Sequence, residues 1–439
     1  MRKLSFQKIF CFISILFIGS CCLFYGTRFI KLYRQNENEK RIEINSLVKV
    51  IKEKNKDNDN FKKINDQMYF TSDSDNNYLY YSNILWRIIK INDDNSIVAI
   101  ANNSLTSLAY GMDTSYLDSY VHKWLNIGDS EYSGILERQL NQVSKYLQKN
   151  SICLDKVNIV GNTPCDNVDN NYYFSLLSTT DFTNIGGKKS FVINDEFFYL
   201  DGINDKNQVW YITDDGKLTL NSGTDIIGIR PVITIRANID YISGSGLVDN
   251  PYVIESENGL FGSYVKLDND IWRIYQVNDT EVRMVLDDYL KVNGQKFTYI
   301  YSNTNGYHND YNYGSIAYYL NHNFLDTLSY KNKIKEVLWT NGYYGETSDY
   351  DYSKAIDKTI NTKVALVSMA DIRLNNKLEN YFTLTSTANK GVIMYVIMAN
   401  QKAYTKNVVS KINVVPAISL DKELLVKGNG TIDSPYEME

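Results

Sequence analysis

Two tyrosine-rich segments contain the residues whose types and spacing best suit the recognition of a ligand. The first runs from Tyr299 to Tyr313 and the second from Tyr343 to Tyr352. Tyrosine side chains offer a large contact area at a low cost in side-chain entropy, and asparagine, serine and glycine add adaptable hydrogen bonds. The predicted ligand-binding residues are Tyr307, His308, Tyr311, Tyr313, Tyr343, Tyr344, Tyr350 and Tyr352. The alternative is that these tyrosines only cover a half-buried sheet.

Cys153 and Cys165 form a close pair, whereas the other three cysteines lie within the first 22 residues. A disulfide between them would close a short loop and stabilise the fold by roughly 3 kcal/mol in the chain-entropy model. Disulfides of this kind persist outside the reducing cytosol. We predict a Cys153–Cys165 disulfide, with two unpaired thiols as the alternative.

Recognisable patterns for catalysis and metal binding are missing from the chain. The three histidines form no spacing with cysteine that suits zinc. Residues 73–77 open like a calcium loop, but Tyr78 and Ile84 occupy the places of its glycine and bidentate glutamate, which indicates a polar turn. A net charge of −5 excludes a basic footprint for nucleic acid. We therefore predict no enzyme activity, no catalytic or metal-binding residues, no cofactor and no nucleic-acid partner.

These residues belong to a chain in which one set of motifs occurs twice, 184 to 190 residues apart and in the same order. The recurring pairs are Asn83–Ile88 with Asn269–Ile274, Leu176–Asp181 with Leu366–Asp371, Ile229–Ile233 with Val414–Ile418, and Gly244–Tyr252 with Gly428–Tyr436. A unit of this length is too long for a solenoid repeat, so the pattern predicts two homologous domains. About nine extra residues lie in the first tyrosine-rich segment of the second repeat.

Strands and short helices alternate within each repeat without the order of βαβ units. Residues 85–91 and 96–101 predict a hairpin, and residues 121–125 place apolar side chains on one face of a short helix, a pattern that recurs at 316–320. The proline in the last strand of each repeat predicts an edge or strand-start position. This arrangement favours the α+β class.

The recurring tryptophans and arginines are predicted to support the fold rather than to bind a ligand. Trp86 and Trp272 lie in the repeated hairpin and are predicted to be core aromatics. Arg87 and Arg273 follow them, and we predict structural ion pairs there. His122 aligns with Ala317, so no shared role requires a histidine, and we predict a surface position on the helix.

The first 65 residues have a different character. Residues 9–27 are uncharged and nearly long enough to cross a bilayer as a helix, which predicts a signal anchor. A lipoprotein signal ending at Cys21 and a simple cleaved signal are the alternatives. The predicted segments are a cytoplasmic tail at 1–8, a transmembrane anchor at 9–27, a polar helical stalk at 28–65, repeat domain 1 at 66–256 and repeat domain 2 at 257–439.

Taken together, the repeated motifs resemble an uncharacterised tandem-repeat domain family of Gram-positive bacterial surface proteins. That family is distantly similar to the C-type-lectin-like fold of formylglycine-generating enzymes. The resemblance implies two compact α+β domains with a twisted antiparallel sheet, displayed outside the cell. It implies no activity, because the late cysteine pair of those enzymes and the calcium-binding triplets of the lectins are absent here.

The sequence therefore predicts a single-pass membrane protein with the bulk of the chain outside the cytoplasm. Its partners would be the membrane, through residues 9–27, and a protein or glycan at the cell surface. Two repeats on one stalk would increase avidity for a repetitive ligand. The alternatives are a structural or assembly subunit of an envelope complex, or an envelope enzyme of the formylglycine-generating-enzyme-like fold.

Overall fold

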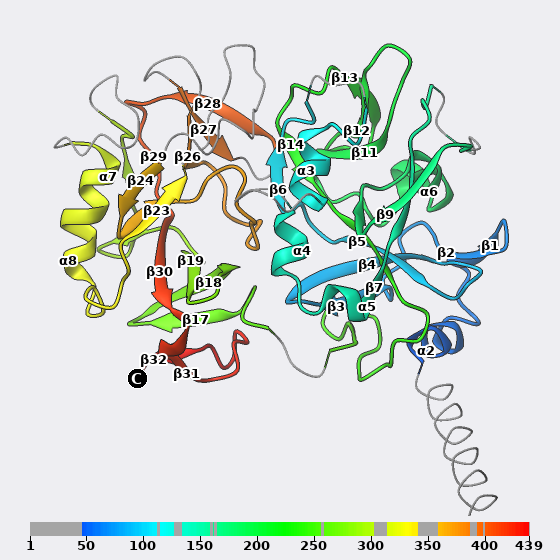
Figure 1. Cartoon of the computed structure of the whole chain (residues 1–439), viewed down its shortest axis with the longest axis horizontal. Coiled ribbons are helices and arrows are strands. Elements are labelled where there is room, and N and C mark those ends of the chain that lie inside the picture. The colour runs from blue at the N-terminus through cyan, green and yellow to red at the C-terminus, as the bar shows by residue number, and fades with distance from the viewer. Residues whose placement is uncertain are drawn as a thin grey trace, which may run out of the picture.

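The computed structural model describes residues 46–111, 115–126, 134–158, 161, 165–255, 259–302, 314–340, 359–386, 393–397 and 400–438. The chain is mostly β sheet, with 39% strand and 15% helix, so the predicted α+β class is wrong. The apolar segments are rich in β-branched and aromatic residues, which favour strands, and the described helices are short. Figure 1 shows the two repeats side by side, repeat 1 on the right and repeat 2 on the left.

The membrane prediction also requires correction. Within the described ranges, no helix is long and apolar enough to cross a bilayer. On this finding the transmembrane helix, the signal anchor and the single-pass membrane location are not supported, and we withdraw them. The predicted anchor at 9–27 lies outside the described residues.

The end of the predicted stalk is part of repeat 1. Helix α2 (Leu47–Lys54) forms where the apolar spacing predicts one, but its buried face of Leu47, Val48 and Ile51 joins the core of the repeat. The backbone N–H of Leu47 donates to the carbonyl of Ile239 at 3.0 Å. The helix packs against the domain because three fully or nearly buried aliphatic side chains stabilise it there far more than helix propensity does.

Repeat 1 is built on two sheets. The larger sheet has the order β1-β2-β4-β5-β15-β10, with β3 and β7 on side branches and β16 parallel to β3. Its strands are β1 (Phe61–Ile64), β2 (Gln67–Phe70), β3 (Tyr78–Tyr81), β4 (Ile84–Ile91), β5 (Ile97–Ala101), β7 (Leu147–Gln148), β10 (Phe174–Ser175), β15 (Val232–Ile235) and β16 (Tyr252–Val253). The β4–β5 pairing confirms the predicted hairpin.

The second sheet of repeat 1 has the order β13-β12-β11-β14-β6 and contains one parallel pair, β11 with β14. Its strands are β6 (Thr106–Leu108), β11 (Phe198–Ile203), β12 (Val209–Ile212), β13 (Leu218–Asn221) and β14 (Ile227–Ile229). A separate hairpin pairs β8 (Asn150–Cys153) with β9 (Val168–Tyr172).

Repeat 2 shares the central strand order of both sheets, but among its described residues the first sheet has no counterparts of β1, β2 and β7. Its sheets have the orders β17-β18-β19-β30-β25 and β22-β29-β26-β27-β28, and β26 is again parallel to β29. The strands are β17 (Tyr264–Leu267), β18 (Asp270–Val277), β19 (Glu281–Leu286), β22 (Thr298–Tyr299), β25 (Val364–Leu366), β26 (Tyr381–Ser386), β27 (Ile393–Ile397), β28 (Ala403–Asn407), β29 (Ile412–Asn413) and β30 (Pro416–Asp421). Small hairpins add β20 (Lys291–Val292), β21 (Gln295–Lys296), β23 (Val337–Thr340), β24 (Thr359–Thr362), β31 (Leu425–Lys427) and β32 (Glu437–Met438).

Short helices join the sheets and cover them. They are α3 (Tyr120–Asn126), α4 (Ile135–Gln139), α5 (Val143–Tyr146), α6 (Thr179–Asn184), η1 (Gly187–Lys189), α7 (Ile316–Tyr318), η2 (Tyr319–Phe324), α8 (Leu325–Thr327) and η3 (Lys422–Leu424). Asn126 donates to the carbonyl of Phe174 at 2.8 Å and accepts from its N–H at 3.1 Å. Asn321 binds both backbone groups of Val364 in the same way, at 2.8 and 3.0 Å. This amide clamp attaches the helix to the sheet in each repeat.

The recurring aromatic and basic residues support the fold in both copies. Trp86 and Trp272 are fully buried, as predicted. Arg87 donates to the hydroxyl of Tyr78 at 2.8 Å, and Arg273 donates to that of Tyr264 at 2.7 Å. Each guanidinium also stacks over the same tyrosine ring and donates to backbone carbonyls. The role is structural, but the partners are tyrosines and carbonyls rather than the predicted carboxylates.

Each repeat closes its chain end beside the strand that precedes the repeated hairpin, which is β3 in repeat 1 and β17 in repeat 2. In repeat 1 the carbonyl of Gly246, in the Gly-x-Gly turn, accepts a hydrogen bond from the N–H of Tyr78 at 2.7 Å. In repeat 2 the carbonyl of Gly430 accepts from Tyr264 at 2.8 Å. A Cβ atom on Gly246 would meet the carbonyl oxygen of Asn76, and its φ of +89° suits glycine alone, so the motif is required at this turn.

The two repeats make a head-to-tail contact. The turn after β25 in repeat 2 inserts against β6 and α3 of repeat 1. Thr106 Oγ1 donates to the carbonyl of Met369 at 2.6 Å, and Trp124 Nε1 donates to that of Ala370 at 2.8 Å. Met369 and Ala370 are buried there. The contact is heterologous, because different surfaces of the two copies meet.

Candidate functional site

All eight predicted ligand-binding residues, which fall within 307–313 and 343–352, lie outside the described residues. Residues 303–313 join β22 to α7, and residues 341–358 join β23 to β24. The matching connections in repeat 1, between β6 and α3 and between β8 and β9, are largely described, and both line a cavity.

An aromatic stack stands at the base of the 303–313 segment. The ring centroids of Phe297 and Tyr319 are 4.5 Å apart, and those of Tyr299 and Tyr319 are 5.1 Å apart. By strand register and the amide clamp, Phe297 and Tyr319 take the places of Thr106 and Trp124. Sequence reasoning missed this stack, because it needs the sheet register to bring β22 and η2 together.

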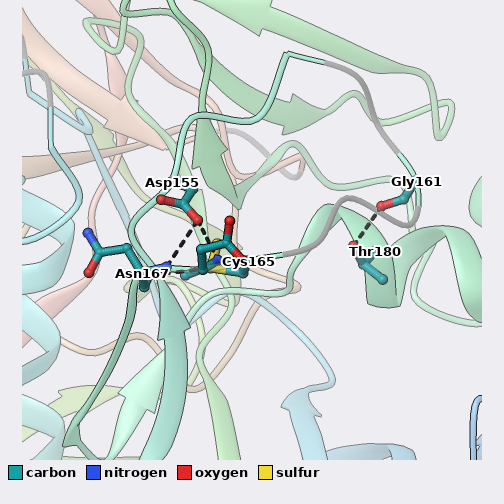
Figure 2. Close-up of a disulfide and its surroundings, with 7 residues drawn as sticks. Asp155, Gly161, Cys165, Asn167 and Thr180 are labelled. Atoms are coloured by element: carbon teal, nitrogen blue, oxygen red, sulfur yellow. Dashed lines mark hydrogen bonds between the residues drawn. A yellow bond between two sulfur atoms is a disulfide. The ribbon is translucent and has the colours of Figure 1, made fainter.

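In repeat 1 the hairpin carries the disulfide predicted from the sequence. The Cys153 and Cys165 sulfurs are 2.04 Å apart. The Asp155 carboxylate accepts from the backbone N–H groups of Asp166, at 2.7 Å, and of Asn167 (Figure 2). Thr180 Oγ1 donates to the carbonyl of Gly161 at 2.6 Å, which connects the loop to α6 (Figure 2). These bonds fix one wall of two cavities.

The larger cavity has a volume of about 560 Å³ and lies between the disulfide loop, α6 and the face of the larger sheet. Amide and hydroxyl side chains, such as those of Asn150, Ser178 and Thr234, form much of its lining. Its charged lining residues are Lys90, Asp93, Asp94, Lys149, Asp155, Lys156, Asp181 and Asp201. Five aspartates face three lysines, so the cavity favours a neutral or cationic ligand over an anion.

An ion pair organises one side of this cavity. Ser178 caps α6, and its hydroxyl accepts from the N–H of Asp181 at 2.9 Å, which places this carboxylate in the first turn. Lys90 Nζ lies 2.8 Å from Asp181 Oδ1, and the hydroxyl of Tyr69 donates to the same oxygen at 2.8 Å. Burial lowers the pKa of Lys90, but Asp181 and Tyr69 outweigh it and the net shift is upward. Burial together with Asp181 raises the pKa of Tyr69 to about 12.

Asp201 lies where the two cavities meet. It lines the larger cavity and also a second one of about 290 Å³, which contains Tyr116, Asp155 and Lys156. Asp201 is only 7% exposed, and its carboxylate makes no hydrogen bond or ion pair with the residues that the structure describes. Burial alone raises its pKa to about 7. A buried carboxylate without a partner is costly, which suggests that it serves a ligand.

Behind Asp201 lies a cluster of buried rings. Tyr110 and Tyr116 are fully enclosed, and burial, followed by the charge of Asp201, raises the pKa of both hydroxyls. The Tyr116 hydroxyl has no hydrogen-bond partner among the described residues. His122 packs 4.9 Å from the Tyr116 ring and is fully buried, so the predicted surface position is wrong. Its counterpart Ala317 is also buried, which shows that this helix position faces the core.

Repeat 2 has leucine at the position of Asp201. The N–H of Asp201 donates to the carbonyl of Leu177 at 2.9 Å, and the N–H of Leu384 donates to that of Val367 at 2.8 Å. The backbone is therefore equivalent, and Leu384 is 2% exposed. A single alignment of the repeats pairs Asp201 with Leu384, a signal that sequence reasoning could have used.

Cys153, Asp155 and Cys165 are the group of potential metal ligands found among the described residues. The sulfurs of Cys153 and Cys165 are joined in the disulfide, so neither is a thiolate that could hold a metal. No family model, curated protein or solved structure was found that matches this chain. The resemblance to the uncharacterised surface-protein family stays a prediction.

Proposed function

We propose that this protein is a non-catalytic binding protein and that the cavities around Asp201 are its ligand site. The observation that carries the proposal is the carboxyl of Asp201, which is nearly buried, faces both cavities and has no partner among the described residues. A ligand that supplies a hydrogen-bond donor or a positive charge would remove the cost of burying this group.

The favoured ligand is a protein that presents a lysine side chain. An ammonium group offers three donors, and the Asp201 carboxylate can accept hydrogen bonds from them. The lining of the larger cavity contains more aspartates than lysines, which also favours a cationic ligand group.

A glycan is the second candidate. The amide and hydroxyl groups of Asn150, Ser178 and Thr180 suit the hydroxyls of a sugar ring, and they line the same cavity. A sugar would leave Asp201 to pair with a neutral donor. The two candidates differ in their dependence on charge, because an ammonium requires an ionised Asp201 whereas a hydroxyl does not.

The test compares lysine-containing peptides with the same peptides after lysine acetylation, measured by fluorescence polarisation on the full chain at pH 8. We expect binding that acetylation abolishes and that Asp201→Asn weakens by at least about tenfold, the equivalent of roughly 1.4 kcal/mol. Asp249→Asn is the matched control, because Asp249 is exposed and lies outside both cavities.

Three outcomes would contradict parts of this proposal. Equal binding by the Asp201→Asn variant would remove Asp201 from the site. Equal binding of acetylated peptides, with competition by neutral sugars, would replace the protein ligand with a glycan. Conversion of the peptide or sugar, detected by mass spectrometry and lost in the Asp201→Asn variant, would replace the binding function with an enzymatic one.

A further inference from the structure

A third cavity, of about 410 Å³, lies between the two repeats. Repeat 1 lines it with Tyr80, Asn83 and Asn103, and repeat 2 lines it with a loop that contains Arg373 and Lys377. Small-molecule sites occur preferentially at domain interfaces. This cavity shares no lining residue with the two cavities around Asp201.

Arg373 is a buried cation in the lining of this cavity. Its side chain is only 6% exposed, and repeat 1 holds its backbone through the carbonyl of Leu105, 2.7 Å from the N–H of Arg373. Nη2 donates to Ser107 Oγ at 2.5 Å and to Gln401 Oε1 at 2.9 Å. Nε and Nη1 have no hydrogen-bond partner among the described residues. Two donors of a buried cation are therefore left to be satisfied.

The other charges around the cavity are mixed but leave an excess of positive charge. Arg273 and the exposed Lys377 add two cations, and Asp287 is the acidic lining residue. Burial raises the pKa of Asp287, and Arg273 lowers it in part. Glu196 lies outside the lining, and Ser104 donates to its carboxylate through both N–H and Oγ.

We propose that this cavity binds a carboxylate group of a small molecule or peptide, with Arg373 as its principal donor. A guanidinium presents its donors as a planar fork that matches a carboxylate, and charge-assisted hydrogen bonds of this type are among the strongest in proteins. Asp287 opposes a second negative charge, which disfavours a phosphate dianion. The ligand would contact both repeats, so its binding would stabilise their association.

The proposal is tested by titrating the full chain with acetate and with inorganic phosphate, with binding followed by line broadening of ¹³C-labelled acetate. We expect saturable binding of acetate and a higher melting temperature. Lys377→Ala should weaken binding about threefold and Arg373→Lys about tenfold, the size of one charge-assisted hydrogen bond. Lys377 is exposed, so its replacement preserves the fold even if Arg373→Lys does not.

Lys427→Ala serves as the control, because Lys427 is an exposed lysine of repeat 2 outside the cavity. The proposal is overturned if acetate shows no saturable binding, or if Lys377→Ala binds it no more weakly than Lys427→Ala. Tighter binding of phosphate than of acetate would overturn the assignment to a carboxylate. These results are independent of the peptide assay, because Asp201 belongs to different cavities.

Discussion

The segments Ser178–Asp181 and Ser368–Asp371 are copies of one repeated sequence motif, but they have different roles in the structure. In repeat 1 the segment caps a helix, and its aspartate pairs with Lys90 on the wall of a cavity. In repeat 2 the aspartate accepts from the N–H of Ser368 at 2.7 Å, and the turn is buried against repeat 1. One copy forms part of the contact between the repeats, and the other copy lines a cavity.

The two repeats also differ at equivalent positions in their interiors. Asp201 and Leu384 have equivalent backbone bonds, yet the first is an unpaired acid beside two cavities and the second is a buried aliphatic residue. Repeat 1 therefore accepts a cost in stability that repeat 2 does not, which is typical of a functional site. Exchanging features between the two repeats tests this difference directly.

The largest effect is expected from Leu384→Asp, which places the acid of repeat 1 in repeat 2. Loss of the leucine and burial of a carboxylate should lower the free energy of unfolding by about 5 kcal/mol at pH 8. Urea unfolding measures the change, with Leu384→Asn as the uncharged control. If both variants are equally destabilised, charge burial is not the cause and the two positions do not differ as proposed.

The reverse exchange should stabilise the protein. The pKa of Asp201 is raised to about 7, so the folded state binds more protons than the unfolded state, and stability falls as pH rises from about 4 to 7. Asp201→Asn should remove this loss and increase the free energy of unfolding by up to about 4 kcal/mol at pH 8, with little effect below pH 4. Urea unfolding across this range provides the measurement. A pH-independent effect of the substitution would contradict the buried, ionising carboxyl.

Removing the disulfide should affect repeat 1 alone, since Thr340 occupies the place of Cys153 in repeat 2. The double substitution of Cys153 and Cys165 by serine should cost roughly 3 kcal/mol in unfolding free energy. Thermal unfolding with and without a reductant separates the bond from the substitutions. Reductant should lower the melting temperature of the wild type and leave the double variant unchanged. A change in the melting temperature of the double variant on adding reductant would show that the reductant does not act through this disulfide.

The smallest effect should be the same in both repeats. Asn126→Ala and Asn321→Ala each remove two hydrogen bonds to a strand backbone, so each should destabilise by about 2 kcal/mol. Hydrogen exchange at the N–H groups of Phe174 and Val364 reports each clamp separately. A large difference between the two variants would show that the clamps are not equivalent.

The sequence predicted the parts of the fold that depend on local pattern. The hairpin of β4 and β5, the short helix around Trp124 and the burial of Trp86 follow from periodicity and from the repeat itself. Pro231 immediately precedes β15 and Pro416 begins β30, so both lie at a strand start, as predicted, although both strands are central; a proline, which lacks an N–H, is tolerated there.

The rest depended on long-range contacts. His122 was assigned to the surface because its counterpart Ala317 gave it no shared role, and its burial between tyrosine rings requires knowledge of the packing around α3. The prediction of the α+β class was wrong because the amphipathic spacing of the short helices is clear in the sequence, whereas the number of short strands around them is not. Asp201 was overlooked because the four recurring motifs do not include it; aligning the whole repeats would have paired it with Leu384, but its burial and its missing partner are known only from the structure.

The closure of each repeat has a consequence for how such a protein evolves and can be engineered. In repeat 1 Ser46 bridges to Asp240 and Tyr252 pairs with Leu79 of β3, and in repeat 2 Tyr436 bridges to Val265 of β17. Entry and exit of each unit therefore lie together, the arrangement that permits domain insertion and circular permutation. A unit of this kind can be copied, appended or transplanted as a module, and the new termini need no rebuilding of the sheet.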